Sequence, residues 1–195
     1  MLRIVAGKFG GRLVKSPEGL STRPTSQFAR EALFSILADE IPGAAFVDLF
    51  AGSGAVGIEA LSRGAAYALF ADSGRGSCRA INENLAMLGL GRGEALALNM
   101  DLTAQAAFAM LRDAVIGLSG GPARIVFADP PYAYGGAAGL PVQISSAGIC
   151  NAGGIIVIEH GAKAEMPETG GAQGPGLHKY SVRRYGGSCF SFYRV

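Results

Sequence analysis

The chain of 195 residues is 49% hydrophobic and 16% charged, which suits one folded domain with a full core and excludes a disordered chain. No apolar run reaches the roughly 20 residues that a membrane-spanning helix needs, and the charged first residues do not read as a signal peptide. Three widely spaced cysteines, Cys78, Cys150 and Cys189, predict neither a disulfide framework nor a metal site. We therefore expect a cytoplasmic monomer with reduced cysteines and no membrane contact.

Basic residues are concentrated at the two ends of the chain. Residues 1–30 hold six Arg or Lys against one acid, and residues 177–195 hold four against none. The segment between them holds seven bases and fourteen acids, so a net charge of only +2 hides an uneven pattern. Two basic ends on an acidic body predict a surface for a polyanion if the ends meet in space; otherwise they are ordinary solvated faces.

The first part of the chain predicts an extension of the main fold. Residues 2–6 and 11–15 are short β-prone runs around a glycine-rich turn, which indicates a hairpin, and a turn-rich loop follows. Helical spacing of apolar residues predicts a helix over 26–39, capped by Ser26. We expect one domain, 1–195, in which residues 1–25 extend a main body of residues 26–195.

From residue 44 onward, apolar strands and helices alternate. Strands are expected at 44–50, 66–72, 94–101, 123–129 and 153–160, with helices at 54–64, 76–90 and 102–115. This alternation predicts an α/β fold with a mostly parallel, doubly wound sheet. The chain ends differently, because 179–185 and 188–195 flank a two-glycine turn and predict an antiparallel hairpin.

A glycine-rich segment, "VDLFAGSGAVGIEAL", connects the first of these strands to its helix. Gly52, Gly54 and Gly57 match the pattern with which a backbone turns tightly around a nucleotide, and Asp72 is placed to accept ribose hydroxyls. Asp48 stands four residues before Gly52, where it would repel a pyrophosphate and attract a cation. The spacing therefore favours S-adenosylmethionine over a nicotinamide dinucleotide.

A second segment, "VFADPPYAY", ends the fourth strand with chemically useful groups. Carboxyl ends of parallel strands meet at one edge of the sheet, so Asp129 is expected near the glycine loop. The Asp129 carboxylate and the Pro130 carbonyl can accept the two hydrogens of a nucleobase amine, which frees its lone pair. Pro131 stiffens the loop, and the ring of Tyr132 can stack on the base. The segment thus predicts alkylation of an amine on a nucleobase.

These stretches resemble the bacterial small-subunit ribosomal RNA guanine-N2 methyltransferase family. The matching segments, in the family's order, are "RIVAGKFGGRLVKSPEGLSTRPTSQFAREALFSIL", "VDLFAGSGAVGIEALSRGA", "INENLAMLGL", "FADPPY", "IIVIEH" and "RRYGGSCFSFY". The resemblance implies a Rossmann-like class I methyltransferase with a seven-stranded sheet, a C-terminal antiparallel hairpin and an N-terminal β-hairpin extension. It also implies methyl transfer from S-adenosylmethionine to the N2 amine of a guanine in small-subunit ribosomal RNA, free or in an assembling particle.

The resemblance assigns roles to named positions. Catalytic roles fall on Asp129, Pro130, Pro131 and Tyr132. Cofactor binding falls on Asp48, Phe50, Ala51, Gly52, Ser53, Gly54, Asp72, Ser73, Asp101 and Leu102. RNA binding is expected of Arg3, Lys8, Arg12, Lys15, Arg23, Arg30, Arg183 and Arg184, although Arg30 could instead brace a loop or pair with Glu31 or a helix-end carbonyl.

Three other functions stay open on the sequence. An adenine-N6 or cytosine-N4 methyltransferase would share the same amine-binding segment. A nicotinamide dehydrogenase would share the glycine loop. An RNA-binding assembly factor would share the basic ends and carry out no turnover. The alanine-rich segment 102–115 and the leucine-poor segment 133–152 depart from the family pattern.

Overall fold

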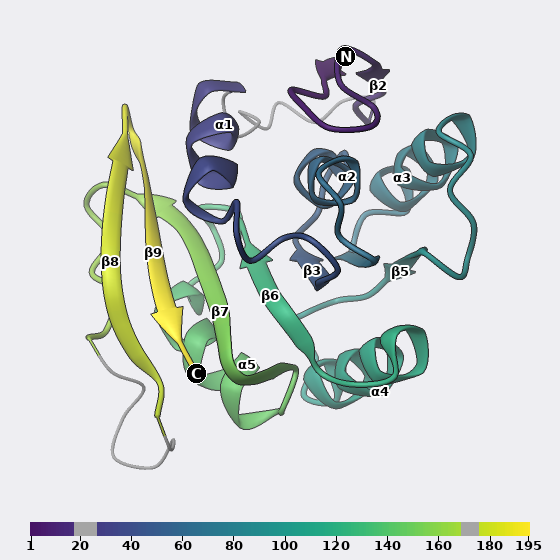
Figure 1. Cartoon of the computed structure of the whole chain (residues 1–195). Coiled ribbons are helices and arrows are strands. Elements are labelled where there is room, and N and C mark those ends of the chain that lie inside the picture. Colours follow the sequence, from purple (N-terminus) through teal and green to yellow (C-terminus); the bar gives the residue numbers. More distant parts are fainter. Residues whose placement is uncertain (18–26, 169–175) are drawn as a thin grey trace.

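The computed structural model describes residues 1–17, 27–168 and 176–195 (Figure 1). Within them, the main sheet comprises β3 (Ala45–Leu49), β4 (Tyr67–Asp72), β5 (Ala95–Asn99), β6 (Ala123–Ala128), β7 (Cys150–Gly161), β8 (His178–Tyr185) and β9 (Ser188–Arg194). The helices are α1 (Gln27–Ile36), α2 (Ala55–Ser62), α3 (Arg75–Met87), α4 (Ala107–Ser119) and α5 (Leu140–Ser146), with a 3₁₀ turn, η1 (Ala137–Gly139). A separate hairpin pairs β1 (Leu2–Arg3) with β2 (Leu13–Val14).

The strand order of the main sheet is β5-β4-β3-β6-β7-β9-β8. Strands β3 to β7 run parallel, whereas β9 is antiparallel to both β7 and β8. The expected fold is thereby confirmed. The chain winds outward from β3 to β5 and then returns to β6, so the switch point lies between β3 and β6. Ligands of doubly wound sheets bind outside the carboxyl ends of the strands at such a point.

Helices cover both faces of the sheet (Figure 1). On one face, α4 and α5 supply Leu111 and Ile144 to a core cluster that also contains Val126 and Ile158. The other face packs against α1, α2 and α3 through two further clusters. Because both faces are covered, the central strands read as continuous apolar runs, as the sequence indicated.

The N-terminal hairpin, residues 2–15, is built onto α2 and α3. Its Ile4 and Val14 are buried in one cluster with residues of these helices, such as Ile58. The buried carboxylate of Glu59 in α2 accepts hydrogen bonds from the backbone nitrogens of Val5 (2.7 Å) and Ala6 (3.0 Å). The hairpin, residues 2–15, therefore buries its apolar side chains against the main body rather than in a core of its own.

Two elements differ from expectation. The helix predicted over 102–115 begins later, at Ala107, because the Asp101 carboxylate accepts hydrogen bonds from the backbone nitrogen and the hydroxyl of Thr103 and turns the chain. Helix α5 was not predicted, since glycines precede it and it has only seven residues. The cap Ser26 and Arg23 lie outside the described residues. The three cysteines are free and buried, and no helix of the described chain has the length and apolarity to span a membrane.

Candidate functional site

The glycine loop between β3 and α2 takes left-handed backbone conformations. The φ angles are 58° at Phe50, 54° at Gly52 and 73° at Gly54. Phe50 is the one non-glycine residue of the described chain with a positive φ, and its ring meets that of Tyr134 edge-on, with centroids 5.0 Å apart. Apart from its two chain neighbours, no described residue has an atom within 4 Å of the position that a Cβ on Gly52 would take. The loop therefore leaves open space against its backbone.

Asp48 connects β3 to the start of α2 under the glycine loop. Its carboxylate is 2% exposed and accepts a hydrogen bond of 2.9 Å from the backbone nitrogen of Gly57. Burial, together with the charges of Asp129 and Asp72, raises the pKa of Asp48 well above its ordinary value. A side chain at Gly57 would force the ring of Phe70 to move, because a Cβ there would stand 2.3 Å from that ring.

Asp72, at the end of β4, joins two turns. One carboxylate oxygen accepts from the backbone nitrogen of Gly52 at 2.8 Å, and the other accepts from that of Gly74 at 2.7 Å. The carbonyl of Ser73 accepts from the side chain of Asn99 at 2.9 Å. Each carboxylate oxygen keeps a second lone pair, so Asp72 can still accept a hydrogen bond from a ligand.

Asp129 lies directly beside the glycine loop, as expected. Strand β6 pairs with β3, and the Asp129 backbone nitrogen approaches the Leu49 carbonyl at 3.3 Å. Burial and the charge of Glu159 raise the pKa of Asp129 to about 8. Tyr132 is 85% exposed, so its ring face is open to a partner. Asp48, Asp72 and Asp129 thus gather at one edge of the sheet.

Asp101 and Leu102 are placed differently from each other. Asp101 is exposed, and hydrogen bonds from Thr103 lower the pKa of its carboxyl. Leu102 is buried and lines a cavity of about 600 Å³. Tyr134 and Phe108 line the same cavity, which therefore connects the segment after β5 with the segment after Tyr132.

Sequence reasoning missed three residues at this site. Tyr134 packs against Phe50. Asn84, fully buried in α3, donates from its amide to the carbonyl of Ser53 at 3.2 Å. Glu159, two residues before the end of β7, is 6% exposed and close enough to influence the ionisation of Asp129. The signal for Glu159 was present, since an acid follows the apolar run 155–158 as Asp129 follows the apolar run 125–128.

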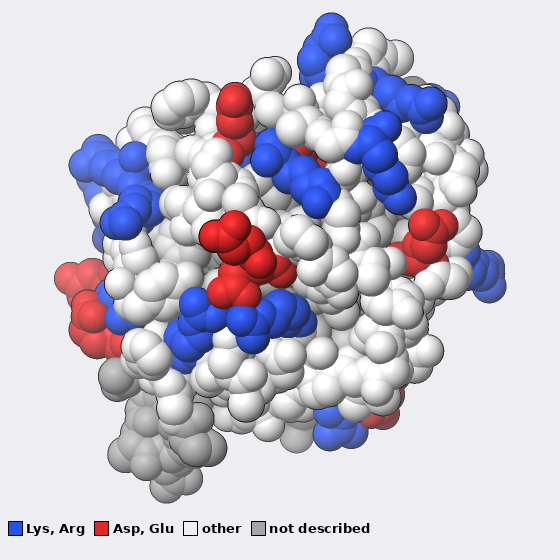
Figure 2. All heavy atoms as spheres, in the orientation of Figure 1, with Lys and Arg blue, Asp and Glu red and all other residues white. Residues whose placement is uncertain are grey.

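The predicted RNA-binding residues divide into exposed and buried ones. Exposed side chains belong to Arg3, Lys8, Arg12, Lys15, Arg183 and Arg184. Figure 2 shows the basic side chains of this face in separate groups, with acidic side chains between them. Among the described residues, the hairpin that carries Arg3, Lys8, Arg12 and Lys15 packs on α2 and α3, whereas Arg183 and Arg184 lie on β8 at the far edge of the sheet. The first basic segment reaches β8 only through α1, where the ring of Phe28 meets that of Tyr185 with centroids 6.0 Å apart.

Arg30 requires a correction. Its side chain is 1% exposed, so a phosphate at the surface cannot reach it. Instead, Nη2 donates to the carbonyl of Arg3 at 2.6 Å and Nε lies 3.9 Å from the carboxylate of Glu59. No pairing with Glu31 is present. Arg30 therefore fastens α1 to the N-terminal hairpin.

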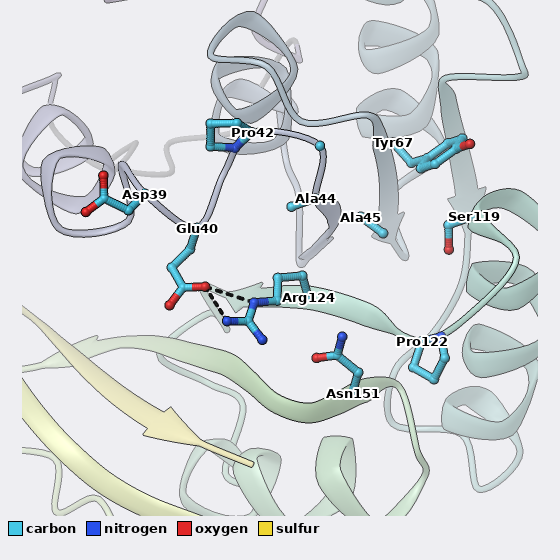
Figure 3. A pocket seen from close by; sticks show the side chains of 11 residues that line it. Asp39, Glu40, Pro42, Ala44, Ala45, Tyr67, Ser119, Pro122, Arg124 and Asn151 are labelled. Atoms are coloured by element: carbon cyan, nitrogen blue, oxygen red, sulfur yellow. Dashed lines mark hydrogen bonds and ion pairs between the residues drawn. The ribbon is translucent and has the colours of Figure 1, made fainter.

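A second cavity, of about 430 Å³, lies at the opposite edge of the sheet (Figure 3). Glu40 reaches Arg124 there, with Nε at 2.8 Å, and Arg194 at 3.1 Å. Although burial acts in the opposite direction, these hydrogen bonds lower the pKa of Glu40. None of the predicted site residues lines this cavity. Among the described residues, no group of three or more His, Cys, Asp or Glu is arranged to hold a metal ion.

Comparisons with known proteins place the chain in a family. A family model described as "Conserved hypothetical protein 95" matches residues 2–194. The chain is 34% identical over 170 residues to "Putative rRNA methyltransferase YlbH" of Bacillus subtilis, covering 87% of this chain and 88% of that protein. It is 38% identical over 135 residues to "Ribosomal RNA small subunit methyltransferase D" of Escherichia coli K12, covering 69% and 62% of the two chains.

The fold is also similar to that of a solved structure. The structure of "Putative methyltransferase yhhF" from Escherichia coli superposes with a TM-score of 0.78 at 30% identity, over 99% of this chain and 97% of that one. The chain belongs to the family described as Conserved hypothetical protein 95, and its fold is that of the class I methyltransferases.

Proposed function

We propose that the protein methylates the N2 amine of a guanine in small-subunit ribosomal RNA, with S-adenosylmethionine as the methyl donor. The observation that carries this proposal is the position of Asp129 to Tyr132 beside the glycine loop, at the switch point of the sheet. Relatives named as rRNA methyltransferases support ribosomal RNA as the class of substrate. The proposal includes a monomeric, single-domain protein that acts on the RNA alone or in an assembling particle.

The residues at this edge fit S-adenosylmethionine. Burial and two neighbouring carboxylates raise the pKa of Asp48, so a cation would relieve the repulsion there, whereas a pyrophosphate would increase it. The open space against Gly52 suits close approach of a ligand to the backbone. The residues that would hold the cofactor are Asp48, Phe50, Ala51, Gly52, Ser53, Gly54, Asp72, Ser73, Asp101 and Leu102. When bound, S-adenosylmethionine supplies an electrophilic methyl group on a positively charged sulfur.

The segment after β6 would hold the guanine. The Asp129 carboxylate and the Pro130 carbonyl accept the two hydrogens of the amine, and Pro131 limits the motion of the loop. Tyr132, with its exposed ring, stacks on the base, which must leave its helix to reach this edge. Asp129 can then take the proton that the amine loses, because a pKa of about 8 makes it a stronger base than an ordinary carboxylate.

The test is nucleoside mass spectrometry of ribosomal RNA incubated with the purified protein and labelled S-adenosylmethionine. RNA and particles from cells that lack the protein are the substrates, and N2-methylguanosine is the expected product. Asp129→Ala should abolish the product while leaving cofactor binding largely intact. Asp113→Ala, which removes an exposed aspartate of α4, is the matched control and should keep full activity.

Other products would identify the alternatives. N6-methyladenosine or N4-methylcytidine would show a different amino-directed methyltransferase. Calorimetric binding of NAD(H) in preference to S-adenosylhomocysteine would favour a dehydrogenase. RNA binding without any methylated nucleoside would favour an assembly factor, and any of these results would refute the proposal.

A further inference from the structure

Glu159 lies beside Asp129 at the carboxyl edge of the sheet. Strands β6 and β7 are parallel, and the last pair of their register is Ala128 with Ile158. Asp129 and Glu159 each follow these partners by one residue. The two carboxyl groups therefore occupy neighbouring strands at the same height.

Both carboxyl groups also belong to the same face of the sheet. Side chains alternate between the faces along a strand. Phe127 and Val157 share the core cluster under α1 and α2, while Ala128 and Ile158 share the cluster on the opposite face. Asp129 and Glu159 each lie two residues beyond this first pair, so both belong to the face that α1 and α2 cover. The influence of the Glu159 charge on the pKa of Asp129 agrees with this proximity.

The exposed ring of Tyr132 completes this arrangement. A Cβ on Gly161, two residues beyond Glu159, would stand 3.2 Å from the Tyr132 ring. The loop that carries Tyr132 therefore closes against the end of β7. A stacking surface, Asp129 and a second, buried carboxylate converge at one place.

Guanine differs from the other amino-bearing bases next to its reactive amine. Its N1 carries a hydrogen beside N2, whereas N1 of adenine is an acceptor beside N6. A buried carboxylate accepts a hydrogen bond from N1 of guanine and repels the lone pair on N1 of adenine. A carboxylate offers about four acceptor positions, so Glu159 can serve the base whatever else it contacts.

We propose that Glu159 makes the site selective for guanine by accepting the N1 hydrogen of the base whose N2 amine is held by Asp129. This inference rests on the proposed function and names a residue that sets its specificity. Glu159 is 6% exposed, and burial strengthens the discrimination that a carboxylate makes between a hydrogen-bond donor and an acceptor.

The test replaces the target guanine by 2-aminopurine in a synthetic RNA that spans the mapped target site. 2-Aminopurine keeps the N2 amine but has an acceptor at N1. The wild-type protein should prefer guanine by about 100-fold in kcat/KM, as expected of a site that leaves a buried group unpaired with the wrong substrate. Glu159→Gln, whose amide can donate to N1, should reduce this preference at least about tenfold.

Two further variants separate selectivity from stability. Glu159→Asp withdraws the carboxylate by one methylene and should lower kcat/KM for guanine about tenfold, with little change for 2-aminopurine. Glu165→Gln removes an exposed acid and should leave the ratio unchanged. Thermal unfolding shows whether each variant folds, and the wild-type ratio remains informative if one does not.

The outcomes distinguish this inference from the proposed function. Equal wild-type activity on both bases, or an equal loss on both in Glu159→Gln, overturns the role of Glu159 while guanine methylation stands. Absence of N2 methylation by the wild-type protein overturns the proposed function and the role of Glu159 with it.

Discussion

The side chain of Asn84 and the backbone of Lys15 exchange two hydrogen bonds although 69 residues separate them. The Lys15 nitrogen donates to Oδ1 at 2.8 Å, and Nδ2 donates to the Lys15 carbonyl at 3.0 Å. The same amide also reaches the Ser53 carbonyl in the glycine loop. One buried side chain therefore joins the end of the N-terminal hairpin to the proposed cofactor site.

Asn84→Ala should destabilise the protein and weaken cofactor binding together. Two backbone groups of Lys15 and one of Ser53 lose their partner, which should cost about 2–4 kcal/mol in the free energy of unfolding. Urea unfolding and calorimetry with S-adenosylhomocysteine measure the two effects. Asn82→Ala is the control, because Asn82 is exposed on the same helix and bonds only to the Cys78 carbonyl in the described chain. Equal behaviour of the two variants would refute the connection.

Removal of Glu59 should leave a buried cation without its partner. Arg30 is buried, burial already lowers its pKa and Glu59 opposes that change. Glu59→Gln should therefore cost roughly 3–5 kcal/mol in denaturant unfolding. The double variant Arg30→Met with Glu59→Gln should recover part of this loss. Additive destabilisation in the double variant would contradict the pairing.

Activity should rise with pH as Asp129 ionises. Its pKa is about 8 in the free protein, so only a fraction of molecules carry the carboxylate at neutral pH. Its charged neighbours are Glu159 on β7, which raises this pKa, and Asp48 on β3, whose own pKa is raised by burial and by the charges of Asp129 and Asp72. All are acids, so a cationic cofactor should lower this pKa. We expect kcat/KM, which reports the free enzyme, to rise with pH through a midpoint near pH 8. The midpoint for kcat, which reports the enzyme with its ligands bound, should lie at lower pH. Both midpoints should move to lower pH in Glu159→Gln, which removes a neighbouring negative charge.

The same pKa predicts the stability of Asp129→Asn. The folded-state pKa lies above the ordinary value of 3.8, so the acid contributes its full stability below pH 4 and loses it as pH rises towards 8. Asparagine does not titrate. The variant should exceed the wild type in free energy of unfolding by roughly 1 kcal/mol or more at pH 8.5, with a smaller difference at pH 5. A difference independent of pH would show that the raised pKa is wrong.

Gly57→Ala should disturb the glycine loop through Phe70. The added Cβ would overlap the ring at 2.3 Å, and such overpacking costs about 1–3 kcal/mol. Cofactor affinity should fall as well, because the Gly57 nitrogen binds Asp48. Phe70→Leu in the same chain makes room and should restore part of both properties. Gly76→Ala in α3, where a Cβ meets no atom within 4 Å, is the control.

The sequence was sufficient to predict the sheet and to place three aspartates at one edge of it. Strand and helix periods alternate, and an acid follows each apolar strand near the glycine loop, so Asp48, Asp72 and Asp129 could be brought to one edge by topology alone.

Contacts between distant segments could not be predicted. Arg30 looked like a surface cation, since nothing in its own helix indicates that the N-terminal hairpin covers it. Glu59 and Asn84 sit on helices and read as ordinary polar positions until the hairpin packs against them. Glu159 was overlooked beside His160, whose ring bonds to Ser191 and the Gly161 carbonyl within the structure.

The edge position of β8 has a consequence for solubility. Among the described residues, no further strand pairs with its outer side, where the Lys179 nitrogen donates to the Glu168 carbonyl. The remaining backbone groups of such an edge can recruit another strand and begin aggregation. Arg183 and Arg184 are exposed on this strand, and charges there oppose such pairing. The two arginines would thus protect the free protein before they meet any phosphate. Lysine replacements, which keep this protection, are therefore better suited than alanine replacements to measuring what the arginines contribute to RNA binding.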